Sequence, residues 1–271
     1  MDSNAHRTGY DPGFLGPAIE PPARAGEGAA VAYDDGEVVP YAHFSLSMHG
    51  ARRLARWVAW NIDGGGLMRL NRTGIRFTKD RRVPAGHQAG DELYSANRLD
   101  RGHIARRADL LWGGREEAEA ANRDSFYFTN IAPQLDDFNQ SSRQGVWGRI
   151  EDALFEDVEV QGLRASVFGG PVFHDDDRVY RGVPIPREFW KLVAFLHDDH
   201  LTARAFLLTQ NLSVLEALEI DEFRTYQVSV AELEDRTGLR FDAPLHDADT
   251  LAVTADDALR RPLDAPADIQ W

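Results

Sequence analysis

Five stretches of this chain combine apolar, aromatic and β-branched residues in runs of strand length. They are HFSLSM (43–48), RWVAWNI (56–62), LRASVFGGPVF (163–173), EFWKLVAFL (188–196) and ARAFLLTQN (203–211). Such runs, bounded by polar or Gly-containing connections, are typical of strands that pack on a core. We therefore predict that these stretches form the main strands of a sheet.

Helical patterns occur between and after these runs. Residues 115–122 favour helix by composition, and GVWGRIEDALFEDV (145–158) spaces its apolar residues by four, which indicates an amphipathic helix. In SVAELEDRTGL (229–239), Ser229 and Glu232 have the spacing of a capping box, so a helix should follow Ser229. The stretch SFYFTNIAP (125–133) predicts a short strand closed by Pro133. Together these elements predict one mixed α+β domain.

The domain is expected to span residues 40–243. Residues 1–39 are rich in Gly, Pro and Ala and predict an irregular N-terminal arm. Residues 244–271 are acidic and interrupted by proline, which predicts a peripheral C-terminal tail. No internal repeat is evident.

Composition limits the class of protein. With 271 residues, of which 43% are hydrophobic and 27% charged, the chain can bury a full core. No stretch approaches the roughly 20 apolar residues of a membrane span, and the N-terminus lacks the basic start and apolar run of a secretory signal. We therefore expect no membrane partner and a cytoplasmic location by default, with export as an effector left open. The absence of cysteine excludes disulfides, thiolate metal sites and cysteine nucleophiles.

The formal net charge is −14, but the charge is unevenly distributed. Residues 72–107 hold nine Arg or Lys and four Asp or Glu, a net charge of +5, which leaves −19 for the remainder. A positive patch on an acidic body suits a phosphate-bearing substrate. A solvated surface with no binding role would have the same composition, so charge alone leaves both interpretations open.

The most informative stretch within this patch is NRLDRGHIARR (97–107), which gathers arginines around His103. A neutral imidazole can take a proton from water, and nearby guanidinium groups lower its pKa and keep it unprotonated. Arginines hold phosphate through paired N–H donors and stabilise charge on its oxygens. The combination suits phosphodiester hydrolysis, although a lone histidine near arginines can also be structural.

Further motifs follow His103 in a fixed order. LDRGHIA (99–105), FYFTNIAPQLDDFNQ (126–140) and WGRIED (147–152) together resemble the DNA/RNA non-specific endonuclease family, whose active site is called the ββα-metal or His-Me finger. FGGPVF, VPIPREFWKLV, AFLLTQN and FRTYQVSVAELEDRTGLRF are similar to the later strands and closing helix of that family, so the resemblance covers residues 40–243. It implies a largely antiparallel central sheet flanked by helices, with a ββα-metal motif.

The resemblance also implies roles for single residues. His103 would be the general base that activates water, Arg101 and Arg76 would clamp the phosphate and the transition state, and Asn130 would support the phosphate or the water network. Arg106 and Arg107, directly behind the motif, would bind substrate. Apart from the resemblance, we expect Gln134 to help hold the loop after Asn130 by hydrogen bonding.

The implied cofactor is one divalent cation, Mg²⁺ or alternatively Mn²⁺. Asn139 would be its single direct protein ligand, and Glu151 would order the metal-bound waters. These two residues are twelve apart, four more than in the family, with Ser141–Gln144 inserted. On a regular helix the glutamate would then point about 120° away from the asparagine. We therefore expect residues 141–144 to form a bulge or loop that turns Glu151 back toward the same side as Asn139.

Two other clusters, FHDDDR (173–178) and HDDH (197–200), contain residue types that bind metals. Both lie between strand-like runs, where charged hairpin turns are expected.

The leading hypothesis is thus a Mg²⁺-dependent endonuclease that cuts DNA and RNA. Two alternatives remain: a catalytically silent or inhibited nucleic-acid-binding or partner-binding module of the same fold, and a hydrolase of small phosphodiesters. A homodimer and an inhibitor or immunity protein as partner are left open.

Overall fold

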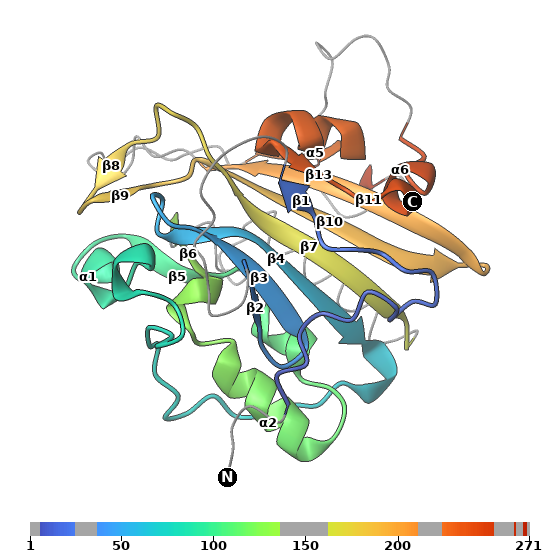
Figure 1. The fold of residues 1–271 in the computed structure, drawn as a ribbon, viewed down its shortest axis with the longest axis horizontal. Coiled ribbons are helices and arrows are strands. Elements are labelled where there is room, and N and C mark those ends of the chain that lie inside the picture. Colours follow the sequence, from blue (N-terminus) through green and yellow to red (C-terminus); the bar gives the residue numbers. More distant parts are fainter. Residues whose placement is uncertain are drawn as a thin grey trace.

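The computed structural model describes residues 6–24, 37–135, 162–210, 224–251, 263 and 268–269. Its centre is a seven-stranded sheet in the order β12-β11-β10-β7-β4-β3-β2, in which every neighbouring pair is antiparallel (Figure 1). The strands are β2 (Val38–Pro40), β3 (Phe44–His49), β4 (Leu54–Asp63), β7 (Arg164–Val172), β10 (Glu188–His197), β11 (His200–Thr209) and β12 (Arg224–Val228). The five strands predicted from hydrophobic runs are confirmed.

Three two-stranded sheets and several short helices surround the central sheet. The small sheets pair β1 (Ala23–Arg24) with β13 (Leu239–Arg240), β5 (Leu99–His103) with β6 (Ile131–Leu135), and β8 (Val179–Tyr180) with β9 (Val183–Pro184). The helices are α1 (Asp91–Tyr94), α2 (Arg115–Asp124), α5 (Val230–Thr237) and α6 (Ala243–Asp247), with 3-10 turns η1 (Gly64–Gly66), η2 (Ala85–His87), η3 (Arg107–Leu110) and η4 (Phe128–Asn130). None of the helices in these ranges has the length and apolar character needed to cross a bilayer.

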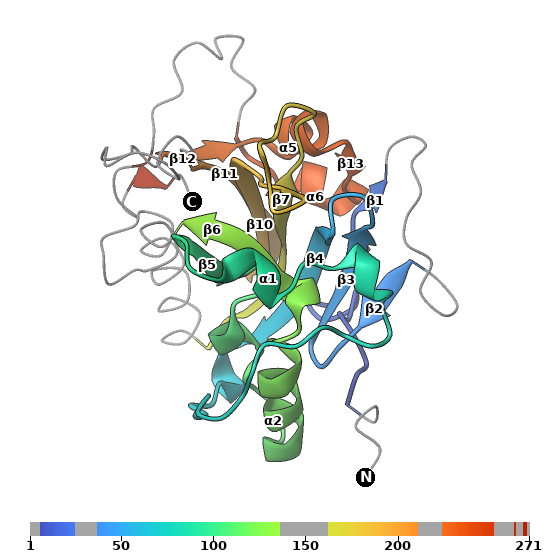
Figure 2. The ribbon, with the colours of Figure 1, turned by 90° about the vertical axis from the view of Figure 1, so that its left-hand side faces the viewer.

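Side chains of the central strands alternate between two cores. Val58, Val167 and Val193 face one core, whereas their neighbours Trp57 and Phe168 face the other. The first core is completed by the segment that contains α1, β5, η3, α2 and β6. The second is completed by the N-terminal arm, α5 and α6. Figures 1 and 2 show α5 and α6 together at the end of the molecule away from α2.

Both terminal segments contribute to the second core. In the arm, Tyr10, Phe14, Leu15 and Ile19 are buried, and Ile19 is 0% exposed. Beyond residue 243, Leu245 is also 0% exposed. The core therefore includes side chains from the two segments that the sequence analysis set apart as arm and tail.

The local predictions vary in outcome. Ser229 accepts a hydrogen bond from the Glu232 backbone N–H and begins α5 as expected. The HDDH stretch is a two-residue hairpin turn, in which Asp198 and Asp199 both have positive φ, as a tight turn between twisted strands requires. The strand predicted over 125–133 is wrong in its bounds: residues up to Asn130 form turns, and the strand Ile131–Leu135 continues through Pro133. Proline is tolerated because β6 pairs only with β5 and is an edge strand.

Candidate active site

The site is built on the β5–β6 hairpin, which places LDRGH beside IAPQL. Gly102 pairs with Ala132 and His103 with Ile131. Alternation along β5 directs Arg101 and His103 to one face, and both side chains contact the ring of Phe77. A Cβ atom on Gly102 would collide with the Gln134 side chain, which crosses this position. Glycine therefore leaves the space that the Gln134 side chain occupies, and a larger residue would require that side chain to move.

His103 lies at the end of β5 against two aromatic rings that also pack on each other. Its imidazole is 5.7 Å from the ring of Phe77 and 5.3 Å from that of Phe126, the second in an edge contact. The Nε2 atom is enclosed and has no hydrogen-bond partner among the residues that the structure describes. Burial, followed by the positive charges of Arg107 and Arg72, lowers the pKa of His103 to about 4. The imidazole is therefore neutral at neutral pH, as the sequence analysis expected of arginine neighbours.

The two arginines that act on His103 come from separate segments. Arg107 begins η3, and its Nη2 donates to the Leu70 carbonyl at 2.7 Å. Burial and the charge of Arg72 lower the pKa of Arg107. The Arg72 loop is held by Asn122 of α2, whose Nδ2 donates to the Asn71 carbonyl at 3.0 Å. These backbone anchors hold two like charges close to each other, an arrangement that an anion would relieve.

The other predicted cations lie in different surroundings. Arg101 donates twice to Asp91 Oδ1, at 2.6 and 3.2 Å, and its guanidinium lies over the rings of Phe77 and Tyr94. Arg76 and Arg72 are exposed, and neither guanidinium has a hydrogen-bond or ion-pair partner within the described ranges. Arg106 is half-buried. The structure thus brings Arg72 and Arg107 close to His103, whereas Arg101 forms an ion pair with Asp91.

Asn130 is the most enclosed of the predicted site residues, with 0% exposure. Its Oδ1 accepts from the Ala105 backbone N–H at 2.9 Å, and its Nδ2 donates to the carbonyls of Ala105 and Ser125. All three contacts hold backbone, including the residue two positions after His103. In this arrangement the side chain holds the loop that follows His103.

The sequence predicts a metal site at Asn139, with Glu151 ordering its waters. Asn139 and Glu151, and the insertion at residues 141–144 between them, lie outside the described residues. Among the residues that are described, no group of three or more His, Asp or Glu side chains is placed to hold a metal ion.

Two site features have no signal in the linear sequence. The packing of Phe77 and Phe126 on His103 joins segments about two dozen residues on either side of the histidine. Arg72 was one of several neighbouring arginines and could not be singled out by spacing. The hydrogen bonds from Asn122 to the Asn71 carbonyl and from Arg107 to the Leu70 carbonyl hold its loop in this position.

Comparison with known proteins places this site in a family. Residues 27–248 match the DNA/RNA non-specific endonuclease family. The chain belongs to that family. The endonuclease-family segment therefore includes β2 through α6, with the whole of the β5–β6 hairpin.

Individual relatives agree with this assignment. The chain is 35% identical to the uncharacterized protein y4fB of Sinorhizobium fredii over 90% of its own length, and it spans 40% of that protein. It is 32% identical to a nuclease of Nostoc sp., with 73% of this chain and 70% of the nuclease covered. The solved structure of an EndoG/EndoGI complex, which addresses EndoG inhibition, superimposes with a TM-score of 0.59 at 18% identity, over 78% of this chain and 86% of that one. The endonuclease-family fold is thus shared with EndoG.

Proposed function

We propose that this chain is a metal-dependent endonuclease that hydrolyses phosphodiester bonds of DNA and RNA with little sequence preference. The observation that carries the proposal is a neutral histidine beside two arginines; among the described residues its Nε2 has no hydrogen-bond partner and the two arginines have no acidic partner. Family membership, with the nuclease of Nostoc sp. among the relatives, supports the same reaction class.

The arginines account for substrate binding. Arg72 and Arg76 are exposed and have no hydrogen-bond partner among the described residues, so their N–H donors can bind substrate, and Arg72 and Arg107 place two positive charges close to His103. Guanidinium groups bind phosphate oxygens through parallel N–H donors and stabilise the charge that builds on them during displacement. Arg101 can exchange Asp91 for a phosphate at small cost, because this ion pair is exposed and exposed pairs contribute only about 0–1 kcal/mol.

The imidazole of His103 is the proposed base. It takes a proton from a water molecule as the water oxygen attacks phosphorus, and the bond from phosphorus to the 3′ oxygen breaks. A pKa of about 4 keeps the base unprotonated but makes it weak. The negative charge of a bound phosphodiester would offset Arg72 and Arg107, which raises the pKa of His103 toward the working range when substrate is present.

The proposed cofactor is Mg²⁺, with Asn139 as its protein ligand and Glu151 ordering its water shell. The Nε2 of His103, which has no hydrogen-bond partner in the described part of the chain, fits a site in which an ordered water is the nucleophile. When bound, the ion would stabilise charge on the phosphate and on the leaving 3′ oxygen.

The test is cleavage of supercoiled plasmid and of single-stranded RNA with Mg²⁺, with EDTA, and with His103→Ala in parallel. Internal cleavage of both polymers, lost with EDTA and reduced roughly 100-fold to 10,000-fold by the substitution, is the expected result. Arg115→Ala is the matched control, because Arg115 is an exposed arginine of α2 that pairs with Glu119. Binding of both polymers without cleavage under any divalent ion would instead identify a silent binding module.

A further inference from the structure

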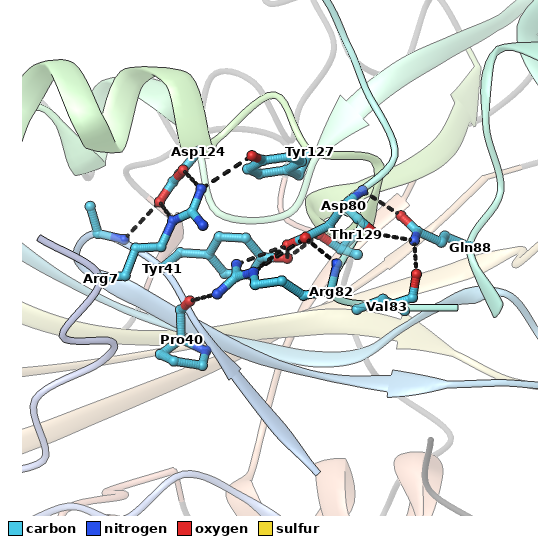
Figure 3. A network of polar contacts seen from close by, with 11 residues as sticks. Arg7, Pro40, Tyr41, Asp80, Arg82, Val83, Gln88, Asp124, Tyr127 and Thr129 are labelled. Atoms are coloured by element: carbon cyan, nitrogen blue, oxygen red, sulfur yellow. Dashed lines mark hydrogen bonds and ion pairs between the residues drawn. The ribbon is translucent and has the colours of Figure 1, made fainter. Parts of the chain in front are cut away.

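The N-terminal arm is tied to the end of α2 by a buried ion pair. Arg7 Nε donates to Asp124 Oδ2 at 2.9 Å and Arg7 Nη2 to Asp124 Oδ1 at 2.7 Å, and the two side chains are 10% and 5% exposed. Arg7 Nη2 also donates to the Tyr127 hydroxyl at 3.1 Å, and its guanidinium lies over the ring of Tyr41 (Figure 3). Residues 117 positions apart are thereby joined by a parallel two-bond contact, the geometry that arginine and carboxylate favour.

The turn that follows Asp124 is held from a second direction. The Tyr41 hydroxyl contacts Thr129 Oγ1 and Asp80 Oδ2, each at 2.7 Å. Arg82 in turn donates to Asp80 and to the Pro40 carbonyl, so these residues form one connected network (Figure 3). Residues 124–129 are therefore held at both ends, by Arg7 of the arm at Asp124 and by Tyr41 of the loop before β3 at Thr129.

The inner side of the same turn forms the His103 environment. Phe126 supplies the ring that lies edge-on to the imidazole. Asn130, at the end of the turn, accepts from the Ile104 backbone N–H through its carbonyl and exchanges two hydrogen bonds with Ala105 through its side chain. The residues directly after His103 are thus fixed to the turn that Arg7 holds.

If Arg7 had only a structural role, it would stabilise the fold without affecting the reaction. The position of Asp124 favours an additional effect of Arg7 on the His103 site. Without Arg7, this buried carboxylate would keep the Ala42 backbone N–H, which donates to its Oδ2 at 3.2 Å, but would lose the positive charge that neutralises it. A buried charge that loses its ion-pair partner draws in water or moves. Either response changes the segment that contacts His103.

We propose that Arg7 is a positioning residue for His103, acting through Asp124 and the turn 124–130. The inference rests on the proposed nuclease function for its kinetic readout. Arg7 lies outside the family match, which begins at residue 27, so the arm supplies a contact that the matched segment does not contain.

The test compares Arg7→Ala, Arg7→Lys and Asp124→Asn with a matched control, Arg52→Ala. Arg52 forms the same kind of partly buried pair, with Asp177 at 3.0 Å and the His174 carbonyl at 2.7 Å, and is 14% exposed. Neither partner belongs to the network of Figure 3. Each variant is assayed well below its own unfolding midpoint.

The expected result is a fall in kcat of roughly 10-fold to 100-fold for Arg7→Ala with little change in KM, because the base is misplaced while the cations remain. Arg52→Ala should leave kcat unchanged despite a similar loss of stability. Arg7→Lys should be intermediate, since lysine keeps the charge but cannot make the paired contact. Arg7→Ala and Asp124→Asn should be non-additive in the double variant. If Arg7→Ala does not fold, the lysine variant and Asp124→Asn carry the same comparison.

A second readout does not depend on activity. The imidazole resonances of His103, assigned with His103→Gln, are titrated by NMR in each variant. A titration midpoint that moves from about 4 toward 6.5 in Arg7→Ala but not in Arg52→Ala supports positioning. Equal midpoints and equal kcat per folded molecule would overturn it. If the wild type cuts no nucleic acid, the proposed function fails, while the titration still decides the role of Arg7.

Discussion

The ring of Phe126 lies edge-on to the imidazole of His103, with 5.3 Å between centroids and 85° between planes. Because Phe126 is 4% exposed, this contact shields one side of the imidazole from water. Shielding disfavours the charged form, and burial is the largest cause of the low pKa of His103. The aromatic neighbour thus helps to set the protonation state on which the proposed chemistry depends.

Replacing Phe126 by alanine should therefore hydrate His103 and raise its pKa by about 1 to 2. The acid limb of kcat/KM against pH, expected near pH 4 in the wild type, would move up by the same amount. A pH profile from 3.5 to 8 measures this. Phe14→Ala, which removes a buried ring from the other core, is the control and should leave the acid limb in place.

Arg107→Ala should change both acidity and salt dependence. Loss of the charge raises the pKa of His103, because Arg107 is the largest electrostatic cause of its depression. Loss of one phosphate contact should lower the slope of log K against log salt by about 1. Binding to a labelled oligonucleotide at several salt concentrations checks the second effect. An unchanged slope would exclude Arg107 from the phosphate interface.

Stability should depend on pH through two histidines. The folded-state pKa of both His49 and His103 is lowered to about 4, while the unfolded value is near 6.5. Because the unfolded chain binds these protons first, the folded state is unaffected above pH 6.5 and loses stability as pH falls from 6.5 to 4. The loss is at most about 3 kcal/mol for each histidine and less where solvent screens the group. Urea unfolding of the wild type and of His49→Gln across this window measures it, and an identical pH dependence in the two proteins would contradict the assignment for His49.

Gly102→Ala should destabilise the β5–β6 hairpin by about 1–3 kcal/mol, because the added methyl group meets the Gln134 side chain. Shortening that side chain makes room, so Gly102→Ala combined with Gln134→Ala should recover part of the loss. Thermal unfolding of the two single variants and the double variant forms the cycle. Strict additivity would show that the two positions do not compete for the same space.

Local patterns were sufficient for much of the fold. Hydrophobic runs predicted the five main strands, and the Ser229 cap predicted α5, because strand and helix periodicity and capping depend on residues close together in sequence. The turn before β6 was missed, since the apolar residues Phe126 and Phe128 serve tertiary packing there and imitate a strand. Propensity gives no means to separate the two cases.

The sequence by itself determined the five main strands and the family, because hydrophobic runs and the ordered motifs around His103 and Asn130 are patterns of residues close together along the chain. Only the tertiary structure decided which arginines act on His103, that Asp91 holds Arg101, and that Arg7 joins the turn behind the imidazole. The physical reason is that these contacts depend on spatial distance and not on separation along the chain. Charge interactions and buried ion pairs depend on distances in space between segments up to 117 residues apart, and no local spacing encodes those distances.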